Sequence, residues 1–297
     1  MKVLLTGSTG QLGYEIIQSK PKEIEIINPN RKELDLSDYE SCKNIIIKVK
    51  PDWIINCGAY TAVDEAEKNI QLSNKINSYA LQAFTEIINK TNGKLLHLST
   101  DFVFDGNQNF PYQENQKKNP ICQYGKSKAL GEELIERKIK KKENATILRT
   151  SWLISPRGKN FILTMLKLHS EKEFINVVSD QIGAPTSAID LSKVCWKIIQ
   201  FKKQEKLPFI LHWTDAGVAS WFDVAVAVGD IAEELKIIKK KAKINPISSN
   251  QYPTTARRPK YSVLNTKKTH SLLKIQPIHW RENLKNILIN YKKINNL

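Results

Sequence analysis

Short apolar runs alternate with longer amphipathic segments through the first half of the chain. The apolar runs predict strands, and the segments with apolar residues at helical spacing predict helices between them. The strands are expected at residues 2–5, 23–27, 53–56, 95–99 and 146–150, and the helices at 12–19, 39–49, 72–89 and 123–140. This alternation indicates βαβ units and a parallel sheet. Right-handed crossovers would place the loops at the carboxyl ends of the strands around one cleft.

The alternation breaks down after residue 152. Helices are expected at 161–170, 190–201, 221–235 and 280–292, a strand at 209–213 and irregular structure at 246–259. We therefore predict an α/β fold, a Rossmann-type doubly wound parallel sheet with a smaller C-terminal substrate-binding domain. Residues 1–153 would form the NAD(P)-binding domain, with about 185–213 returning to it. Residues 154–184 and 214–297 would form the substrate-binding domain.

Composition indicates a soluble globular protein, with 41% hydrophobic and 26% charged residues among 297. No run approaches the roughly 18 apolar residues of a membrane span. The apolar N-terminal run meets glycines after a few residues, so it predicts a buried strand rather than a signal peptide. Four scattered cysteines without a CxxC pair favour reduced, packed thiols. We expect a cytoplasmic protein that does not bind a membrane.

A formal charge of +16 raises the question of nucleic acid as a partner. The lysines are spread along the chain, and the local runs at 138–142 and 239–243 close helix-like segments, where cations complement the helix dipole. Such runs are usually solvated faces, so we predict no nucleic-acid partner. A basic surface would still attract an anionic substrate.

A glycine-rich turn follows the first predicted strand. Gly7, Gly10 and Gly13 lie in the sequence TGSTGQLG, directly before a helix. The first glycine would permit the tight turn, the second would let backbone amides approach a pyrophosphate, and the third would allow close packing of helix on strand. Glycine-rich turns are common, but this position at the first βα junction favours dinucleotide binding.

The residues after the second strand bear on which nicotinamide nucleotide fits. An acidic residue there would hold a ribose 2′-hydroxyl, whereas an arginine would favour a 2′-phosphate. The sequence Asn-Pro-Asn-Arg at 28–31 offers Arg31 and no carboxylate. This favours NADPH over NADH, which stays the alternative. Asp35 and Leu36 follow; Asp35 would contact the adenine edge or begin a helix.

A YxxxK motif places Tyr124 and Lys128 on one face of a helix. A tyrosine has a pKa near 10 and needs a neighbouring cation to transfer its proton readily, which Lys128 would supply. Thr100, at the end of the fourth strand, would donate to a substrate carbonyl. Each has a plain alternative: an exposed aromatic near a lysine, and a turn hydroxyl bonded to its own backbone.

With these motifs in order, the chain resembles the dTDP-4-dehydrorhamnose reductase family of the extended short-chain dehydrogenase/reductase superfamily. The resemblance is nearly full length, and its last three motifs lie in the substrate half. The motifs are TGSTGQLG (6–13), NCGAYTAVDEAE (56–67), STDFVFDG (99–106), YGKSKALGE (124–132), RTSWL (149–153), DQIGAPT (180–186), HWTDAGVASWFDVA (212–225) and ARRPKYSVL (256–264).

The resemblance implies NADPH-dependent reduction of the C4 keto group of dTDP-4-dehydro-L-rhamnose to dTDP-L-rhamnose, for cell-surface polysaccharide synthesis. Tyr124 would protonate the forming alkoxide. Lys128 would lower the pKa of Tyr124 and position the nicotinamide ribose. Thr100 would polarise the ketone, with Asp101 beside it at the substrate.

The resemblance also assigns binding residues by motif position. The pyrophosphate would contact Gly10, Gln11 and Leu12, the adenosine end Asp35 and Leu36, and the length of the cofactor Ala59, Tyr60 and Thr61. Trp152 would pack on the sugar. Gln181 and Arg258 would face the nucleotide, where an arginine suits a diphosphate. A surface cation beside a proline turn is the alternative for Arg258.

Two departures and two alternatives stay open. Phe102 stands where the family often has Tyr, so a hydroxyl contact is lost. Some members of the family dimerise through Mg²⁺ held by glutamates, and Glu15 matches one of these positions. Its partners are not identifiable in the sequence, so no metal is predicted. The oligomeric state is expected to be a monomer or a homodimer. Another sugar-nucleotide reductase, epimerase or dehydratase, or a non-catalytic regulatory subunit, are the competing functions.

Overall fold

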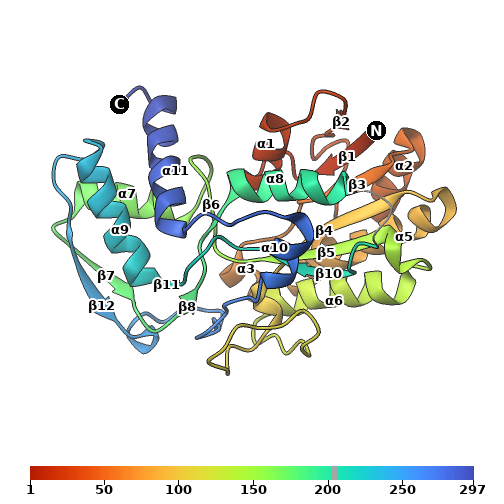
Figure 1. The fold of residues 1–297 in the computed structure, drawn as a ribbon. Coiled ribbons are helices and arrows are strands. Elements are labelled where there is room, and N and C mark those ends of the chain that lie inside the picture. Colours follow the sequence, from red (N-terminus) through yellow and green to blue (C-terminus); the bar gives the residue numbers. More distant parts are fainter. Residues whose placement is uncertain (202–205) are drawn as a thin grey trace.

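A parallel six-stranded sheet forms the centre of the larger of two lobes (Figure 1). The computed structural model describes residues 1–201 and 206–297. The strands are β1 (Lys2–Thr6), β2 (Glu25–Ile27), β3 (Trp53–Asn56), β4 (Lys94–Thr100), β5 (Ala145–Thr150) and β10 (Ile210–His212). Their spatial order is β10-β5-β4-β3-β1-β2, and every pairing is parallel. The α/β, doubly wound fold is thereby confirmed.

The strand order reverses direction at β1, which has β2 on one side and β3 on the other. In open α/β sheets, ligands bind in the crevice outside the carboxyl ends of the strands at such a switch point. The fold therefore directs attention to the loops that follow β1 and β3.

Helices cover both faces of the sheet, which explains why its strands are almost continuously apolar. One face packs against α1 (Gln11–Gln18), α8 (Ala188–Ile199) and α10 (Lys267–Leu273). The other packs against α2 (Tyr39–Val49), α5 (Ala80–Thr91) and α6 (Gln123–Lys138). In β1 the alternation is direct, because Val3 and Leu5 lie in the first core and Leu4 in the second.

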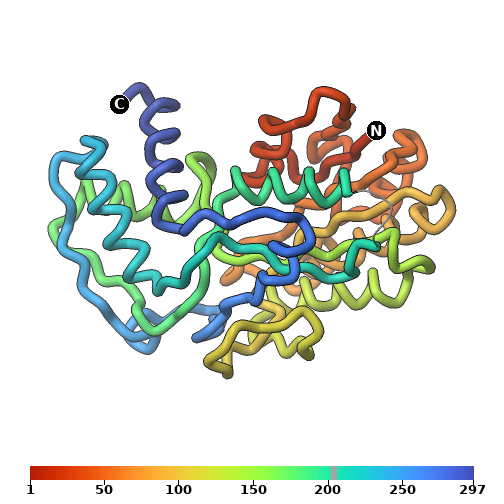
Figure 2. Tube along the Cα trace, in the orientation of Figure 1, coloured from red at the N-terminus to blue at the C-terminus, as the bar shows by residue number. Residues whose placement is uncertain are grey.

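The smaller lobe packs three helices and short strand pairs around a separate core. The helices are α7 (Phe161–Glu171), α9 (Trp221–Glu234) and α11 (Trp280–Ile294). The pairs are β7 (Phe174–Val178) with β12 (Lys243–Ile247), β8 (Ile182–Gly183) with β11 (Ala219–Ser220), and β6 (Leu153–Ile154) with β9 (Thr186–Ser187). The tube in Figure 2 shows the chain passing between the lobes several times.

Several elements differ from the sequence-based expectation. The helix expected at 72–89 is divided into α4 (Ile70–Asn74), a π-helix (Lys75–Tyr79) and α5. The helices α3 (Val63–Lys68) and α10, the strands β7 and β12 and the two-residue strands were not anticipated, because such short elements carry little periodicity. The strand β12 extends into the segment 246–259, which was expected to be irregular. Short single turns lie at Asp101–Val103, Lys142–Asn144 and Ser249–Gln251. Within residues 1–201 and 206–297, no helix has both the length and the hydropathy to cross a membrane.

Candidate active site

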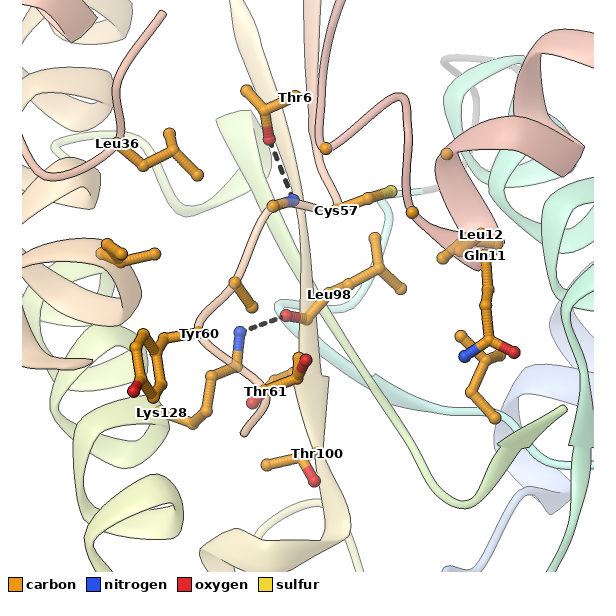
Figure 3. Close-up of a pocket in the computed structure, with 18 of the residues that line it drawn as sticks. Thr6, Gln11, Leu12, Leu36, Cys57, Tyr60, Thr61, Leu98, Thr100 and Lys128 are labelled. Atoms are coloured by element: carbon orange, nitrogen blue, oxygen red, sulfur yellow. Dashed lines mark hydrogen bonds between the residues drawn. The ribbon is translucent and has the colours of Figure 1, made fainter. Parts of the chain in front are cut away.

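A cleft of about 880 Å³ opens at the carboxyl ends of β1, β3 and β4, at the switch point of the sheet (Figure 3). Segments far apart in the sequence meet there. Of the residues predicted to bind or react, the structure brings these to its walls: Gly7, Gly10, Gln11, Leu12, Gly13, Arg31, Asp35, Leu36, Ala59, Tyr60, Thr61, Thr100, Asp101, Tyr124, Lys128 and Trp152.

The glycine loop is tightly constrained. Gly7 has φ +68°, and a Cβ there would lie 2.6 Å from the backbone nitrogen of Gly58, in the loop after β3. A Cβ on Gly13 would lie 2.1 Å from the carbonyl oxygen of Gly7. Gly10 precedes the first turn of α1 and has no side chain to cap its free N–H groups. An uncapped helix start opening into a cleft suits the negative charge of a diphosphate.

The far wall of the cleft holds the residues predicted for the adenosine end. Arg31 is exposed there. The backbone N–H and the hydroxyl of Ser37 both donate to Asp35 Oδ1 at 2.8 Å, and these bonds lower the pKa of Asp35 below its usual range. The Asp35 carboxylate therefore stabilises a turn, and Arg31 supplies positive charge at this wall.

Lys128 extends from α6 along the cleft wall to the Leu98 carbonyl near the end of β4 (Figure 3). Its Nζ donates to the carbonyl oxygen of Leu98 at 2.6 Å and lies 3.3 Å from Nε2 of His97. The side chain is almost fully buried. Burial lowers the pKa of Lys128 to about 8, opposed by the charge of Glu132. The Leu98 carbonyl thus holds the amine in place, and the Lys128 ammonium loses its proton more readily than that of an exposed lysine.

Tyr124 lies one helical turn before Lys128, with its ring edge-to-face against Phe102 (centroids 5.6 Å apart). Burial raises the pKa of Tyr124, and the charge of Asp101 adds to the rise, while a hydrogen bond with Thr100 opposes it. This differs from the expectation that Lys128 lowers that pKa, since the Lys128 amine is turned toward the Leu98 carbonyl. The phenol is therefore protonated at neutral pH, as a proton donor must be.

Thr100 and Asp101 form a linked pair at the end of β4. Thr100 Oγ1 donates to Asp101 Oδ1 at 2.9 Å and accepts from the backbone N–H of Phe102 at 3.2 Å. Asp101 is 2% exposed, and burial raises its pKa to about 6 against the hydrogen bonds from Ser262 and Thr100. To donate to a substrate, the Thr100 hydroxyl must first leave Asp101.

Trp152, Phe161 and Trp221 form an aromatic wall of the same cleft. Trp152 has φ +43°, which is unusual for a bulky side chain. Its ring stacks on Trp221 with centroids 3.5 Å apart and planes 5° apart, and it packs over Gly183, where a Cβ would lie 2.4 Å from the ring. Trp221 and Phe161 also line the cleft and were not singled out from the sequence. The aromatic pair within the motif at 212–225 was the available signal for Trp221.

The remaining predicted residues lie elsewhere. Gln181 Nε2 donates to Ser249 Oγ, and Arg258 pairs with Asp64, with Nη2 to Oδ2 at 2.6 Å. Neither lines the cleft described above, so their contact with a nucleotide stays a prediction. Glu15 is buried, which raises its pKa. Across the described part of the chain, no group of three or more His, Cys, Asp or Glu residues is arranged to hold a metal ion.

A doubly wound sheet, a glycine loop at its switch point and a Tyr–Lys pair beside the same cleft define an NAD(P)H-dependent oxidoreductase of the short-chain type. Comparison with known proteins is more specific. The family model described as "RmlD substrate binding domain" matches residues 1–293. The chain belongs to this family, that of the dTDP-4-dehydrorhamnose reductases.

Individual relatives agree over nearly the whole chain. A dTDP-4-dehydrorhamnose reductase of Aggregatibacter actinomycetemcomitans is 36% identical over 293 residues, covering 96% of this chain and 98% of the relative. The structure of the Bacillus anthracis enzyme in complex with NADP superposes with a TM-score of 0.89 at 33% identity, covering 97% and 99% of the two chains. The UDP-glucose 4-epimerase of Thermus thermophilus (TM-score 0.80, 16% identity, 98% and 99% covered) shares the fold alone.

Proposed function

We propose that the protein catalyses NADPH-dependent reduction of the C4 keto group of dTDP-4-dehydro-L-rhamnose, giving dTDP-L-rhamnose for cell-surface polysaccharides. The observation that carries the proposal is the meeting of Thr100, Tyr124 and Lys128 at one cleft in a chain whose relatives bear this enzyme name. The Bacillus anthracis relative was solved with NADP, which supports the choice of cofactor, as does Arg31 at the adenosine wall.

The residues present fit a nicotinamide dinucleotide. The uncapped start of α1 at Gln11 and Leu12 would hold the pyrophosphate, and Arg31 the 2′-phosphate. Ala59, Tyr60 and Thr61 would lie along the cofactor, and Lys128 would hold the nicotinamide ribose. When bound, NADPH supplies a hydride for the C4 carbon of the sugar.

The chain supplies the proton and the polarisation. Tyr124, a neutral phenol that is partly buried, donates its phenolic proton to the carbonyl oxygen as the C=O bond becomes C–O–H. Thr100 turns from Asp101 to donate to the same oxygen, so the developing negative charge meets two hydroxyl donors. Burial favours the neutral form of Asp101, which would accept more weakly from Thr100 than a carboxylate does.

The substrate side of the proposal rests on the aromatic wall. Trp152, braced by Trp221, would pack on the face of the sugar and exclude water from the reacting carbon. Gln181 and Arg258 would contact the nucleotide; Arg258 would first have to exchange its partner Asp64 for a phosphate. The nucleotide-binding part would comprise 1–153 with 185–213, and the substrate part 154–184 and 214–297, although α10 packs on the former.

We also propose a cytoplasmic location and a monomeric or homodimeric state. The four cysteines are free thiols in the structure, as is usual in a reducing compartment. Sedimentation of the purified protein would test the assembly state.

The proposed reaction is tested by measuring the oxidation of NADPH, followed by its absorbance, with enzymatically generated dTDP-4-dehydro-L-rhamnose as the substrate. Tyr124→Phe should lose about 10²–10⁴-fold in kcat, the usual contribution of a general acid. Tyr79→Phe, an exposed tyrosine, is the matched control. Absence of oxidation by the wild type, with NADPH still bound, would reject the reaction and favour another sugar or a regulatory role.

A further inference from the structure

A row of buried polar side chains crosses the face of the sheet that packs on α6. Thr6, Asn56 and His97 are register partners on β1, β3 and β4, and each is 1% exposed. Two residues earlier on the same strands, the corresponding row is apolar, namely Leu4, Ile54 and Leu95. Buried polar groups are costly unless they are hydrogen-bonded, so this row calls for an explanation.

The row is joined by hydrogen bonds whose direction can be worked out. The backbone N–H of Gly58 can only donate, and it does so to Thr6 Oγ1 at 3.1 Å. The Thr6 hydroxyl donates its own hydrogen to Asn56 Oδ1, 2.5 Å away. The Asn56 amide therefore presents Nδ2 to Nδ1 of His97 at 2.9 Å, and this ring nitrogen must accept. A neutral imidazole with Nδ1 as acceptor carries its hydrogen on Nε2.

That hydrogen is directed at the catalytic lysine, because His97 Nε2 lies 3.3 Å from Lys128 Nζ. Only an uncharged amine has a lone pair to accept it, while an ammonium would meet a second donor. The other contact of Nζ is the Leu98 carbonyl, to which it donates in either state. The chain of bonds that starts at Gly58 thus holds Lys128 in place and disfavours its positive charge.

We propose that His97 is a positioning residue for the reaction, held as the Nε2–H tautomer by Thr6 and Asn56, and that it both orients Lys128 and limits its charge in the cofactor-free protein. The inference rests on the proposed function only for what Lys128 does in turnover. The proposal adds His97 to the site, although this residue lies within the apolar strand β4 and was not singled out from the sequence.

The other titratable groups near Lys128 are either neutral or engaged by other partners, so His97 is the group that orients the amine. From α6, Glu132 is engaged by Arg149 and by Ser99 Oγ, and the neighbouring Tyr124 is a neutral phenol. From the loop after β3, the pKa of Cys57 is raised well above its usual value by burial, so the thiol stays neutral. The pKa of His97 is held well below its usual value by burial and by Lys128, which keeps the ring neutral.

Nitrogen-15 NMR of histidine-labelled, cofactor-free protein tests the tautomer directly. The chain has only five histidines, and His97→Asn identifies the signal of interest. The expected result is a neutral His97 ring with hydrogen on Nε2. An imidazolium, or hydrogen on Nδ1, would overturn the proposal without any variant being needed.

A second measurement tests the control of Lys128 from a distance, by carbon-13 titration of its Cε signal, assigned with Lys128→Met. Thr6→Val keeps the side-chain shape but frees the Asn56 amide to turn, which lets His97 Nε2 accept from an ammonium. The pKa of Lys128 should rise by about one unit, the size of one hydrogen bond. Thr146→Val, a buried threonine of β5 outside the row, is the matched control, and Thr6→Ser should restore the wild-type value.

An unchanged tautomer and an unchanged Lys128 titration in folded Thr6→Val would reject the role of the row. Both measurements are made without substrate, so their outcome is independent of the assigned reaction. A protein with the expected tautomer that fails to oxidise NADPH would contradict the proposed function alone.

Discussion

The ion pair between Glu132 and Arg149 joins α6 to β5 and contacts Ser99, which lines the cleft. Arg149 Nε and Nη2 donate to the two carboxylate oxygens of Glu132 at 2.9 and 2.6 Å, and Ser99 Oγ donates to Oε1 at 2.5 Å. Each side chain of the pair is 1% exposed. Glu132→Gln keeps the shape of the side chain and removes its charge, so the buried guanidinium of Arg149 loses its counter-charge.

Breaking one partner of a buried, hydrogen-bonded ion pair costs about 3–5 kcal/mol, because the remaining charge is left in a poorly polarisable interior. We expect a loss of this size in the free energy of unfolding of Glu132→Gln. Removing both charges in Arg149→Met/Glu132→Leu should cost much less than the sum of the single changes, since no unpaired guanidinium remains. Lys118, which lies 3.7 Å from Glu132, keeps Glu133 as a partner at 3.8 Å. Glu171→Gln, which breaks an exposed pair with Lys167, should cost about 0–0.5 kcal/mol.

Urea unfolding followed by tryptophan fluorescence measures these differences. A loss below about 1 kcal/mol in Glu132→Gln, or a double variant as unstable as the sum, would refute the reasoning. Acid adds a second check. Burial would raise the pKa of Glu132, but Arg149 and the hydrogen bonds outweigh it and hold the pKa below its usual value. The stability from this pair should therefore be present above the pKa of an unfolded glutamate and disappear as the pH falls through the folded value.

Two further predictions concern the aromatic wall and a buried carboxyl. Trp221→Ala removes the stack beneath Trp152; ring pairs contribute about 0.5–1.5 kcal/mol, so KM for the sugar nucleotide should rise roughly 2- to 10-fold while the NADPH dissociation constant, measured by fluorescence, stays unchanged. An equal loss of NADPH affinity would contradict this. Burial raises the pKa of Asp215 to about 7, so its charging destabilises the fold as pH rises from the unfolded value toward 7. Asp215→Asn should therefore unfold at higher urea than wild type at pH 8, and a lower midpoint there would show that its bonds from Asn283 and Ser187 need the charge.

The larger lobe was predictable because its strands are covered on both faces and therefore appear as continuous apolar runs. The prediction for residues 53–56 and 39–49 agrees with β3 and α2 to the residue. The helix expected at 72–89 was wrong in one respect, because apolar spacing does not reveal the wider hydrogen-bond ring of the π-helix at Lys75–Tyr79. The two-residue strands of the smaller lobe form only because distant segments pair with one another, and a local sequence pattern does not predict such pairing.

The candidate site was predictable where function sits at strand ends. Thr100 and the glycine loop follow apolar runs, and the cleft forms where those ends meet. His97 was missed because it lies inside such a run, where a polar residue has the appearance of a core exception. Trp221 was missed because its partner Trp152 is far away in the sequence and only packing brings the rings together.

The passages of the chain between the lobes have a consequence for synthesis. The face of the sheet that carries Val3 and Leu5 is covered in part by α8 and α10, and β10 forms the edge strand beside β5. All three elements come from the second half of the chain. Before the chain beyond β5 has been made, α1 is the helix that covers this face. The nascent larger lobe must therefore stay partly uncovered until α8 and α10 have also been made. An N-terminal fragment that stops at β5 would expose a broad apolar surface, and we expect it to aggregate rather than to bind NADPH.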